Sequence, residues 1–378
     1  MLRSLRLAGR IFPALLAASC DRPTAPLPQM VPAWSVAFVR APENFWSGVP
    51  AADASAVAIV QMTPYPYTRS VLLFDATTGA RLWETVLAAD WADGPFENVA
   101  LTTDYVVIGS GGRVAVLARA NGTLLWQAYH PTLKPVSWVT VAGSTVVSST
   151  SWTITARDLA TGALRWEYAY QPDTVDGAIF ATTVSGDTVY AAADHLNGVL
   201  EYSVAMAVRL IDGGELWRFE VPAPEQGGLR SVTVGGNLLL AGVFVGARGV
   251  QAINRFTLTR PWHTRTDPCC VGVVSTPLVF GSTVYYASGD ETVRAVDLAT
   301  GTEQWVARVQ GSFIDQPALC RDRIFASNGA LFKFDRTSGR TLGVALNTET
   351  EVPSSGLVSN GDLVFISTHD RVNAYRCD

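Results

Sequence analysis

One short sequence pattern recurs along the chain, and it constrains the fold more than any other feature. Segments 73–83, 156–166 and 295–305 match one another closely, and in each of them an Asp stands eight residues and a Gly four residues before a closing Trp. Such self-similarity at a fixed period indicates a repeat architecture, in which each copy forms one unit that packs on its neighbours.

Four weaker copies extend the series, and the closing positions set the period. Two copies end at Trp126 and Trp217, a third ends at Trp262 without the Gly, and the copy that starts at Asp335 has Gly343 where a Trp is expected. The seven closing positions lie 38 to 51 residues apart. This is the length of a four-stranded propeller blade.

Each repeat also has the hydrophobic pattern of strands joined by tight turns. Segments 232–240 and 278–286 both place apolar runs on either side of a Gly-Gly-Asn or Gly-Ser turn, and Gly and Asn readily adopt the positive φ that hairpin turns need. No segment after residue 20 has the period of a long amphipathic helix. We therefore expect an all-β chain, a β-propeller of four-stranded antiparallel blades.

The two ends of the chain predict how the ring closes. Segments 357–366 and 371–375 form three strands of a last blade that lacks its fourth, whereas Trp34 is a motif Trp with no strands before it. Trp34 precedes Trp83 by 49 residues, one blade length. The N-terminal strand is therefore expected to complete an eighth blade and to remove the open sheet edge. A seven-bladed ring would leave Trp34 or the last strands without a role.

The first 32 residues differ in composition from the repeats. Residues 1–19 resemble an export signal, because three Arg precede a short apolar run at 11–18 that is too short to span a bilayer. The junction ending at Cys20 resembles a bacterial lipobox, in which this Cys becomes the lipidated first residue; an ordinary secretory signal is the alternative. Residues 20–32 contain four Pro, which favours an extended tether. The propeller is expected at 33–378.

In the lipobox resemblance, the residue after the Cys bears on the choice of membrane. Asp21 is the residue that retains enterobacterial lipoproteins in the inner membrane, although this rule varies between phyla. We expect a lipoprotein that faces the periplasm or the cell surface and contacts the membrane through its lipid alone.

Charge argues against a nucleic-acid partner. The chain has a formal net charge of −5 and only two lysines, and its arginines form no basic cluster. With 48% apolar and 16% charged residues, the composition is that of a folded chain with a sizeable core.

Four cysteines follow Cys20, an even number in a chain that is expected to be exported and therefore able to form disulfides. They are Cys269, Cys270, Cys320 and Cys377. A vicinal Cys269–Cys270 ring with Cys320 bonded to Cys377 is one of three connectivities, and the sequence leaves all three open. No His or second Cys pair stands at ligand spacing, so no metal site is expected.

The Asp-x-x-Thr-Gly-x-x-x-Trp repeats resemble those of the PQQ-like β-propellers. The resemblance implies that the Trp of one blade packs against the Thr-Gly turn of its neighbour. A repeated unit docks on its own copy only if each copy supplies the same knob and the same flat receptor. A Trp buries up to about 250 Å², and Gly lets the backbone approach closely. This docking role is expected for Trp34, Trp83, Trp126, Trp166, Trp217, Trp262 and Trp305.

The resemblance leaves two classes of function. Quinoprotein dehydrogenases hold PQQ and calcium at the channel, whereas lipoprotein members, which include the outer-membrane β-barrel assembly propeller, bind no cofactor. Cys269-Cys270 favours the dehydrogenase, because a vicinal disulfide packs on the quinone in the alcohol-oxidising members. No acidic cluster accompanies this pair, however, and the insertion at 194–201 is expected to be a solvated hairpin tip.

The loops that join each outer strand to the next blade project on one face and are rich in aromatic residues, which favours a partner surface. The predicted partner-binding rim consists of Phe45, Trp46, Trp91, Phe96, Tyr129, His130, Tyr170, His263 and Phe313.

Together these features predict a non-catalytic scaffold that binds an envelope protein or an extracellular polymer and needs no cofactor. Outer-membrane protein assembly is the most specific role that the family resemblance suggests, and we expect a monomer outside the complex. A PQQ- and calcium-dependent dehydrogenase of alcohols or sugars is the alternative.

Overall fold

The structure is a computed structural model. It describes residues 26–37, 49–63, 68–87, 98–110, 112–130, 138–150, 152–170, 176–197, 200–221, 227–244, 246, 248–267, 272–273, 275–311, 313, 315–345, 353–368 and 371–378. The predicted signal sequence and Cys20 lie outside these residues. The described part of the chain holds no helix with the length and hydrophobicity of a membrane span.

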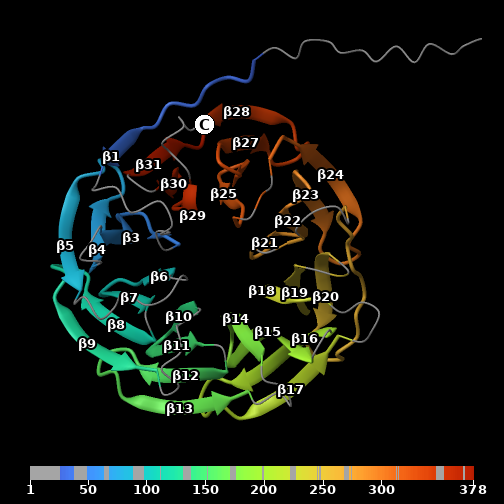
Figure 1. Cartoon of the computed structure of the whole chain (residues 1–378). Coiled ribbons are helices and arrows are strands. Elements are labelled where there is room, and N and C mark those ends of the chain that lie inside the picture. The colour runs from blue at the N-terminus through green and yellow to red at the C-terminus, as the bar shows by residue number, and fades with distance from the viewer. Residues whose placement is uncertain are drawn as a thin grey trace, which may run out of the picture.

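The strands form eight antiparallel sheets arranged around an axis, so the predicted eight-bladed propeller is confirmed (Figure 1). Blade 1 contains β2 (Ala51–Ala52), β3 (Ala56–Thr63), β4 (Thr68–Asp75) and β5 (Arg81–Leu87); blade 2 contains β6 (Asn98–Leu101), β7 (Tyr105–Ser110), β8 (Arg113–Ala118) and β9 (Leu124–Tyr129); blade 3 contains β10 (Trp138–Ala142), β11 (Thr145–Ser149), β12 (Thr153–Asp158) and β13 (Leu164–Ala169); blade 4 contains β14 (Asp176–Ser185), β15 (Thr188–Asn197), β16 (Leu200–Arg209) and β17 (Glu215–Glu220).

The second half of the ring continues in chain order. Blade 5 contains β18 (Leu229–Gly235), β19 (Leu238–Val243) and β20 (Gly249–Asn254); blade 6 contains β21 (Leu278–Phe280), β22 (Thr283–Ser288), β23 (Thr292–Asp297) and β24 (Glu303–Arg308); blade 7 contains β25 (Ala318–Cys320), β26 (Arg323–Ser327), β27 (Leu331–Asp335) and β28 (Thr341–Ala345); blade 8 contains β29 (Pro353–Ser359), β30 (Leu363–Thr368), β31 (Arg371–Arg376) and β1 (Trp34–Ala37).

The N-terminal strand closes the ring, as predicted. β1 pairs antiparallel with β31, with Trp34 opposite Ala374 and Val36 opposite Val372. In Figure 1 the first and last strands accordingly lie side by side in blade 8. The pairing gives this blade four strands, as in both of its neighbours.

The core lies between the blades rather than within one layer. Among the described residues, eight clusters of buried side chains each join two adjacent blades. Middle strands such as β11 and β19 are buried along their whole length, whereas the outer strand β9 is exposed or half-buried throughout. Apolar runs in the sequence therefore mark strands with a blade on each side.

The repeat motif forms the turn before each outer strand. In blade 1, Oδ1 of Asp75 accepts the backbone N–H groups of Thr77 (3.0 Å) and Thr78 (2.7 Å). Gly79 then takes a φ of +72°, and its N–H donates to the Asp75 carbonyl at 2.9 Å. The Thr78 hydroxyl also donates to Oδ1 at 2.8 Å, and this bond, together with the N–H bonds of Thr78 and Thr77, lowers the pKa of the Asp75 carboxyl. The Asp shapes the turn, and the Gly supplies the left-handed residue.

The motif Trp packs on the Gly of the next blade. At six junctions a Cβ added to that Gly would lie 2.5–2.7 Å from the indole ring, closer than any side chain can come. Six indole N–H groups also donate to backbone carbonyls of the next blade at 2.7–3.0 Å: Trp34 to Ala76, Trp83 to Arg119, Trp126 to Leu159, Trp166 to Leu210, Trp262 to Leu298 and Trp305 to Arg336.

Blade 5 departs from the regular pattern in two places. Leu258 stands where the other turns have Gly, and it still adopts the left-handed conformation with a φ of +57°. Its outer edge is not a regular strand: Trp262 and Thr264 bond to the backbone of β20, but only Gln251 and His263 form a β-bridge. Pro261, just before this segment, cannot donate to the ladder.

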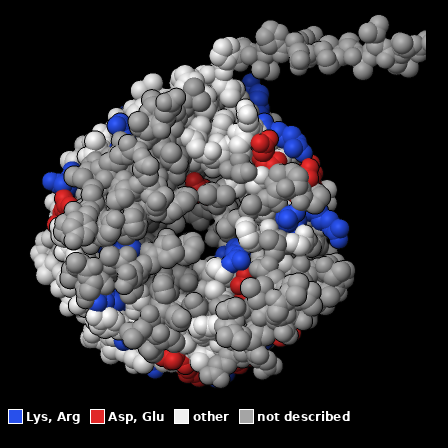
Figure 2. Space-filling view, viewed as in Figure 1, with Lys and Arg blue, Asp and Glu red and all other residues white. Residues whose placement is uncertain are grey.

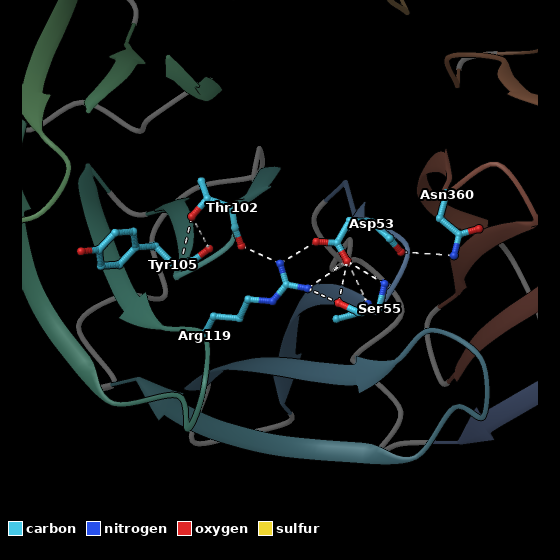
Figure 3. A network of polar contacts seen from close by, with 7 residues as sticks. Asp53, Ser55, Thr102, Tyr105, Arg119 and Asn360 are labelled. Atoms are coloured by element: carbon cyan, nitrogen blue, oxygen red, sulfur yellow. Dashed lines mark hydrogen bonds and ion pairs between the residues drawn. The ribbon is translucent and has the colours of Figure 1, made fainter. Parts of the chain in front are cut away.

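On the face that carries the motif turns, a polar network joins three blades (Figure 3). The Arg119 guanidinium of blade 2 bonds to both carboxylate oxygens of Asp53 in blade 1, at 2.5 and 2.8 Å. Arg119 also donates to Ser55, and Asn360 of blade 8 donates to the Asp53 carbonyl at 3.2 Å. The Arg119 hydrogen bonds hold the pKa of Asp53 well below its ordinary value. The charged pair therefore links the closing blade to the two that follow it.

Gly162→Ala is expected to lower stability more than Gly143→Ala. Both glycines lie in blade 3 with positive φ, at +74° and +56°, but only a Cβ at residue 162 meets the Trp126 ring, at 2.7 Å. Both variants carry the backbone cost, and the first adds a clash of about 1–3 kcal/mol. Thermal unfolding by calorimetry measures the difference, and equal losses would show that the Trp–Gly contact is not tight.

Replacing Asp315 with Asn is expected to change the pH dependence of stability. Asp315 precedes β25 and accepts the backbone N–H of Gly356 in β29 at 3.2 Å, and burial raises the pKa of its carboxyl to about 6. The folded state therefore holds this proton more tightly than the unfolded chain, so the wild type loses stability as pH rises from about 4 to about 6. Denaturation from pH 4 to pH 7 should show Asp315→Asn gaining about 1–3 kcal/mol on the wild type, whereas Asp187→Asn, at an exposed turn, should not.

Candidate protein-binding face

The connections between blades lie on the face opposite the motif turns, and many of them lie outside the described residues. Four predicted rim residues are among those not described: Phe45, Trp46, Trp91 and Phe96. Cys269 and Cys270 are not described either. In the view of Figure 2 the molecule is hollowed at the centre of the ring.

Among the described residues of the predicted rim, Tyr129 is the exposed one. It ends β9 with 53% of its surface exposed. The Arg113 guanidinium lies 4.1 Å from the centre of its ring, and Arg157 donates to its carbonyl at 3.1 Å. An aromatic ring held on a fixed cation loses little conformational entropy when a partner covers it.

His130, next along the chain, is buried, and the prediction that it lies on a binding rim is wrong. Only 2% of its surface is exposed, and Thr153 Oγ1 lies 3.2 and 3.3 Å from its two ring nitrogens. Burial, with the positive charge of Arg157, lowers the pKa of His130 to about 4. The imidazole is therefore neutral at physiological pH. A His beside a hydroxyl suggests acid–base chemistry, but Thr153 is buried as well, with 2% of its surface exposed.

Tyr170 and Phe313 are likewise buried, with 2% and 0% of their surfaces exposed, so the rim prediction is wrong for them too. Tyr170 belongs to the core between blades 3 and 4 and Phe313 to the core between blades 6 and 7. Both side chains point into the core between two blades, and the aromatic content of a loop does not predict which of its side chains are buried. His263 lies half-buried in the irregular outer edge of blade 5.

Arg230, on the inner strand β18, is a second arginine that contacts aromatic rings. The Arg230 guanidinium lies 3.8 Å from the ring centre of Phe180 and 4.9 Å from that of Phe244, and it pairs with Asp194 at 3.0 Å. Asp194 is buried, although the sequence predicted a solvated hairpin tip there. The reason is the length of β15 and β16, which are ten residues each and continue past Asp194.

Sequence reasoning missed this cluster because its members come from separate strands. One signal was present: Arg230 is a charge near the start of an innermost strand, and the 51-residue repeat spacing marked the blade beside it. The cluster offers a rigid, ion-paired cation, a feature that suits recognition of a polar partner surface.

The described residues do not fit the calcium site of a quinoprotein. They contain no group of three or more His, Cys, Asp or Glu side chains placed to share a metal ion. Two described acidic residues have other partners: Asp194 in β15 is ion-paired with Arg230, and Asp315, just before β25, accepts a backbone N–H from blade 8.

The disulfide pattern is partly determined. Cys320 at the end of β25 is bonded to Cys377, the residue after β31. This pairing excludes the two connectivities in which either Cys bonds elsewhere.

Solved structures share this fold at low sequence identity. BamB from Moraxella catarrhalis is 17% identical over 92% of this chain and 97% of its own, with a TM-score of 0.64. The quinohemoprotein alcohol dehydrogenase ADHIIG from Pseudomonas putida HK5 is 13% identical over 93% of this chain and 76% of its own, with a TM-score of 0.67. The computationally designed Ika8 protein is 15% identical, with coverages of 88% and 97% and a TM-score of 0.68.

These likenesses establish the fold, and the sequence itself establishes the family. None of the curated proteins matches the sequence. The family model described as outer membrane protein assembly factor BamB matches residues 32–206 and 201–315, most of the propeller. The chain therefore belongs to this family of PQQ-like β-propellers.

Proposed function

We propose that the protein is an exported, lipid-anchored scaffold of the bacterial cell envelope that binds another envelope protein and catalyses no reaction. The observation that carries the proposal is the family match over residues 32–315 to the BamB assembly factor. Outer-membrane protein assembly is the process in which we place it, and the binding partner is one component of that machinery.

Two features of the described residues support a binding role. Tyr129 is exposed on a fixed arginine, and Arg230 is held between two aromatic rings on the same face of the ring. Tyr and Arg are enriched at the centres of protein interfaces, where rigid side chains contribute most. The described His–Thr pair next along the chain from Tyr129, His130 with Thr153, is buried.

The second candidate is a PQQ- and calcium-dependent dehydrogenase of alcohols or sugars. It is favoured by the similarity to quinohemoprotein alcohol dehydrogenases, which is as close as the similarity to BamB. When bound, the quinone would accept the electrons of the oxidised substrate. The described residues do not supply the calcium ligands that this chemistry needs, so we rank it second.

A photocrosslinking side chain at residue 129 is expected to capture one envelope protein in living cells. The same side chain at Phe256 is the matched control, because Phe256 is 67% exposed but lies in a motif turn on the opposite face. Mass spectrometry of the adducts identifies the partner. Equal capture at both positions would count against a binding face, and uptake of PQQ and calcium in a one-to-one ratio with dye-linked alcohol oxidation would establish the dehydrogenase instead.

Cys20→Ala is expected to move the protein from the membrane fraction to the soluble fraction of the cell envelope. A thioether-linked lipid on this side chain is the anchor that we propose, and Ala cannot carry it. Incorporation of a fatty-acid label into the wild type, compared with the variant, measures the modification. A wild type that is unlabelled and soluble would mean that residues 1–19 are an ordinary secretory signal.

A further inference from the structure

In most blades, the residue after the motif Asp position reaches back to the preceding blade. Its contact point is the inner-strand turn of that blade, as with Arg119 at Asp53 (Figure 3). At three junctions the contact is with the last residue of the innermost strand. Between blades 4 and 5, Arg255 donates to Ser185 at 3.3 Å. Between blades 5 and 6, a Cβ added to Gly235 would lie 2.8 Å from the Leu298 side chain. Between blades 6 and 7, the Arg336 guanidinium lies 5.1 Å from the ring centre of Phe280.

The same position in blade 8 is Cys377. Arg376 is opposite Leu363 in the ladder, as Asp335 is opposite Arg323 in blade 7, so Arg376 occupies the motif Asp position and Cys377 follows it. The N–H of Cys377 bonds to the Asp362 carbonyl at 3.3 Å, just as that of Arg336 bonds to Asp322. Its disulfide partner, Cys320, is the last residue of the innermost strand of blade 7. The disulfide is therefore a covalent form of a contact that recurs around the ring.

The junction between blades 7 and 8 lacks the Trp–Gly contact that six other junctions have. Blade 8 has no motif turn between β31 and β1, because these two strands come from opposite ends of the described chain. A Trp in β28 would have no Gly to pack on, and Gly343 stands in its place. The missing turn leaves a pocket of about 300 Å³ whose lining includes Thr77, Arg321 and Arg376.

The chain covers the vacant Trp position with its own N-terminal segment. The Met30 N–H donates to the Val344 carbonyl at 2.8 Å, and the Val344 N–H donates to the Pro28 carbonyl at 3.0 Å. Met30 packs against the core between blades 7 and 8, and a Cβ on Gly343 would lie 3.1 Å from its Cγ. A short parallel bridge and a thioether side chain thus stand where other junctions have an indole.

We propose that the junction between blades 7 and 8 is a redox-sensitive latch: with the Cys320–Cys377 disulfide formed the ring stays closed, and with it reduced the ring opens at this junction before any other. Both sulfurs are buried, with Cys320 and Cys377 0% and 1% exposed. A dithiol can therefore attack one sulfur only when the side chains that cover the intact disulfide separate locally, without opening of the ring. The second thiol of the reductant then displaces that sulfur, so that two protein thiols and one reductant disulfide result.

Hydrogen exchange on the full-length chain tests the latch with Cys320→Ala/Cys377→Ala. Among the described residues, the backbone amides of Met30, Val344 and Gly356 donate across the junction. Loss of a cross-link between residues 57 apart should speed their exchange by roughly 30-fold or more, while amides of β9 to β12 keep the wild-type rate. Uniform acceleration around the ring, or none, would overturn the proposal.

Trp126→Leu is the matched control at an ordinary junction. It should speed exchange between blades 2 and 3, where Trp126 bonds to Leu159, and leave the three amides of the latch unchanged as long as the disulfide is intact. Acceleration at the latch in this variant would mean that the ring has no single weak junction.

The rate of native-state reduction gives a second readout that needs no cysteine variant. In the oxidised protein exposed to a small dithiol, Met30→Ala should speed the appearance of thiols several-fold, because it removes the side chain that fills the Trp position. Val31→Ala, a neighbour that is 80% exposed, should not. Equal rates for these two variants and the wild type would show that local separation of side chains at this junction does not control access to the disulfide.

Discussion

The structure depends on the contact between an indole ring and a left-handed glycine. Blades 1 to 4 and blade 6 carry both halves of this contact, so they dock on other blades, and the buried apolar surface lies between repeats rather than inside one. The contact is specific because a Cβ has no room at the glycine and because the indole N–H finds a backbone carbonyl in the same turn. Leu258 shows that the turn geometry itself persists without the glycine.

In a closed ring of such contacts, each blade would supply a Trp to the next blade and a motif turn to the Trp of the preceding blade. Blade 8 cannot supply both. Blade 8 gives its indole through Trp34, which bonds to Ala76 of blade 1, but it has no turn with which to receive. The chain compensates at the junction between blades 7 and 8. Gly343 stands in place of a Trp that would have no turn to pack on, and Met30 fills the space. The Cys320–Cys377 disulfide replaces a side-chain contact. The polar network of Asp53, Arg119 and Asn360 then secures the other side of the closing blade.

Periodicity was sufficient to predict the architecture, because the spacing of the Trp positions and the isolated Trp34 are properties of the chain alone. The reason for the lost Trp at 343 could not be foreseen, since it lies in the absence of a turn in a different blade. The candidate site was less predictable. Tyr129 ends β9 and His130 is the next residue, yet Tyr129 is exposed and His130, which contacts Thr153 of the adjacent blade, is buried. The Arg230 cluster joins three strands that no sequence spacing relates.

The pairing of β1 with β31 also sets an order on biosynthesis. The ribosome completes β1 before any blade exists, and its partner strand β31 is made only after the strands of blades 1 to 7. During that interval β1 is an unpaired strand with exposed backbone groups, while blades 1 to 7 already have all their own strands. Ring closure therefore joins two strands that are far apart in the sequence, and a chain truncated before β31 would keep most of its blades and lose the closed circle.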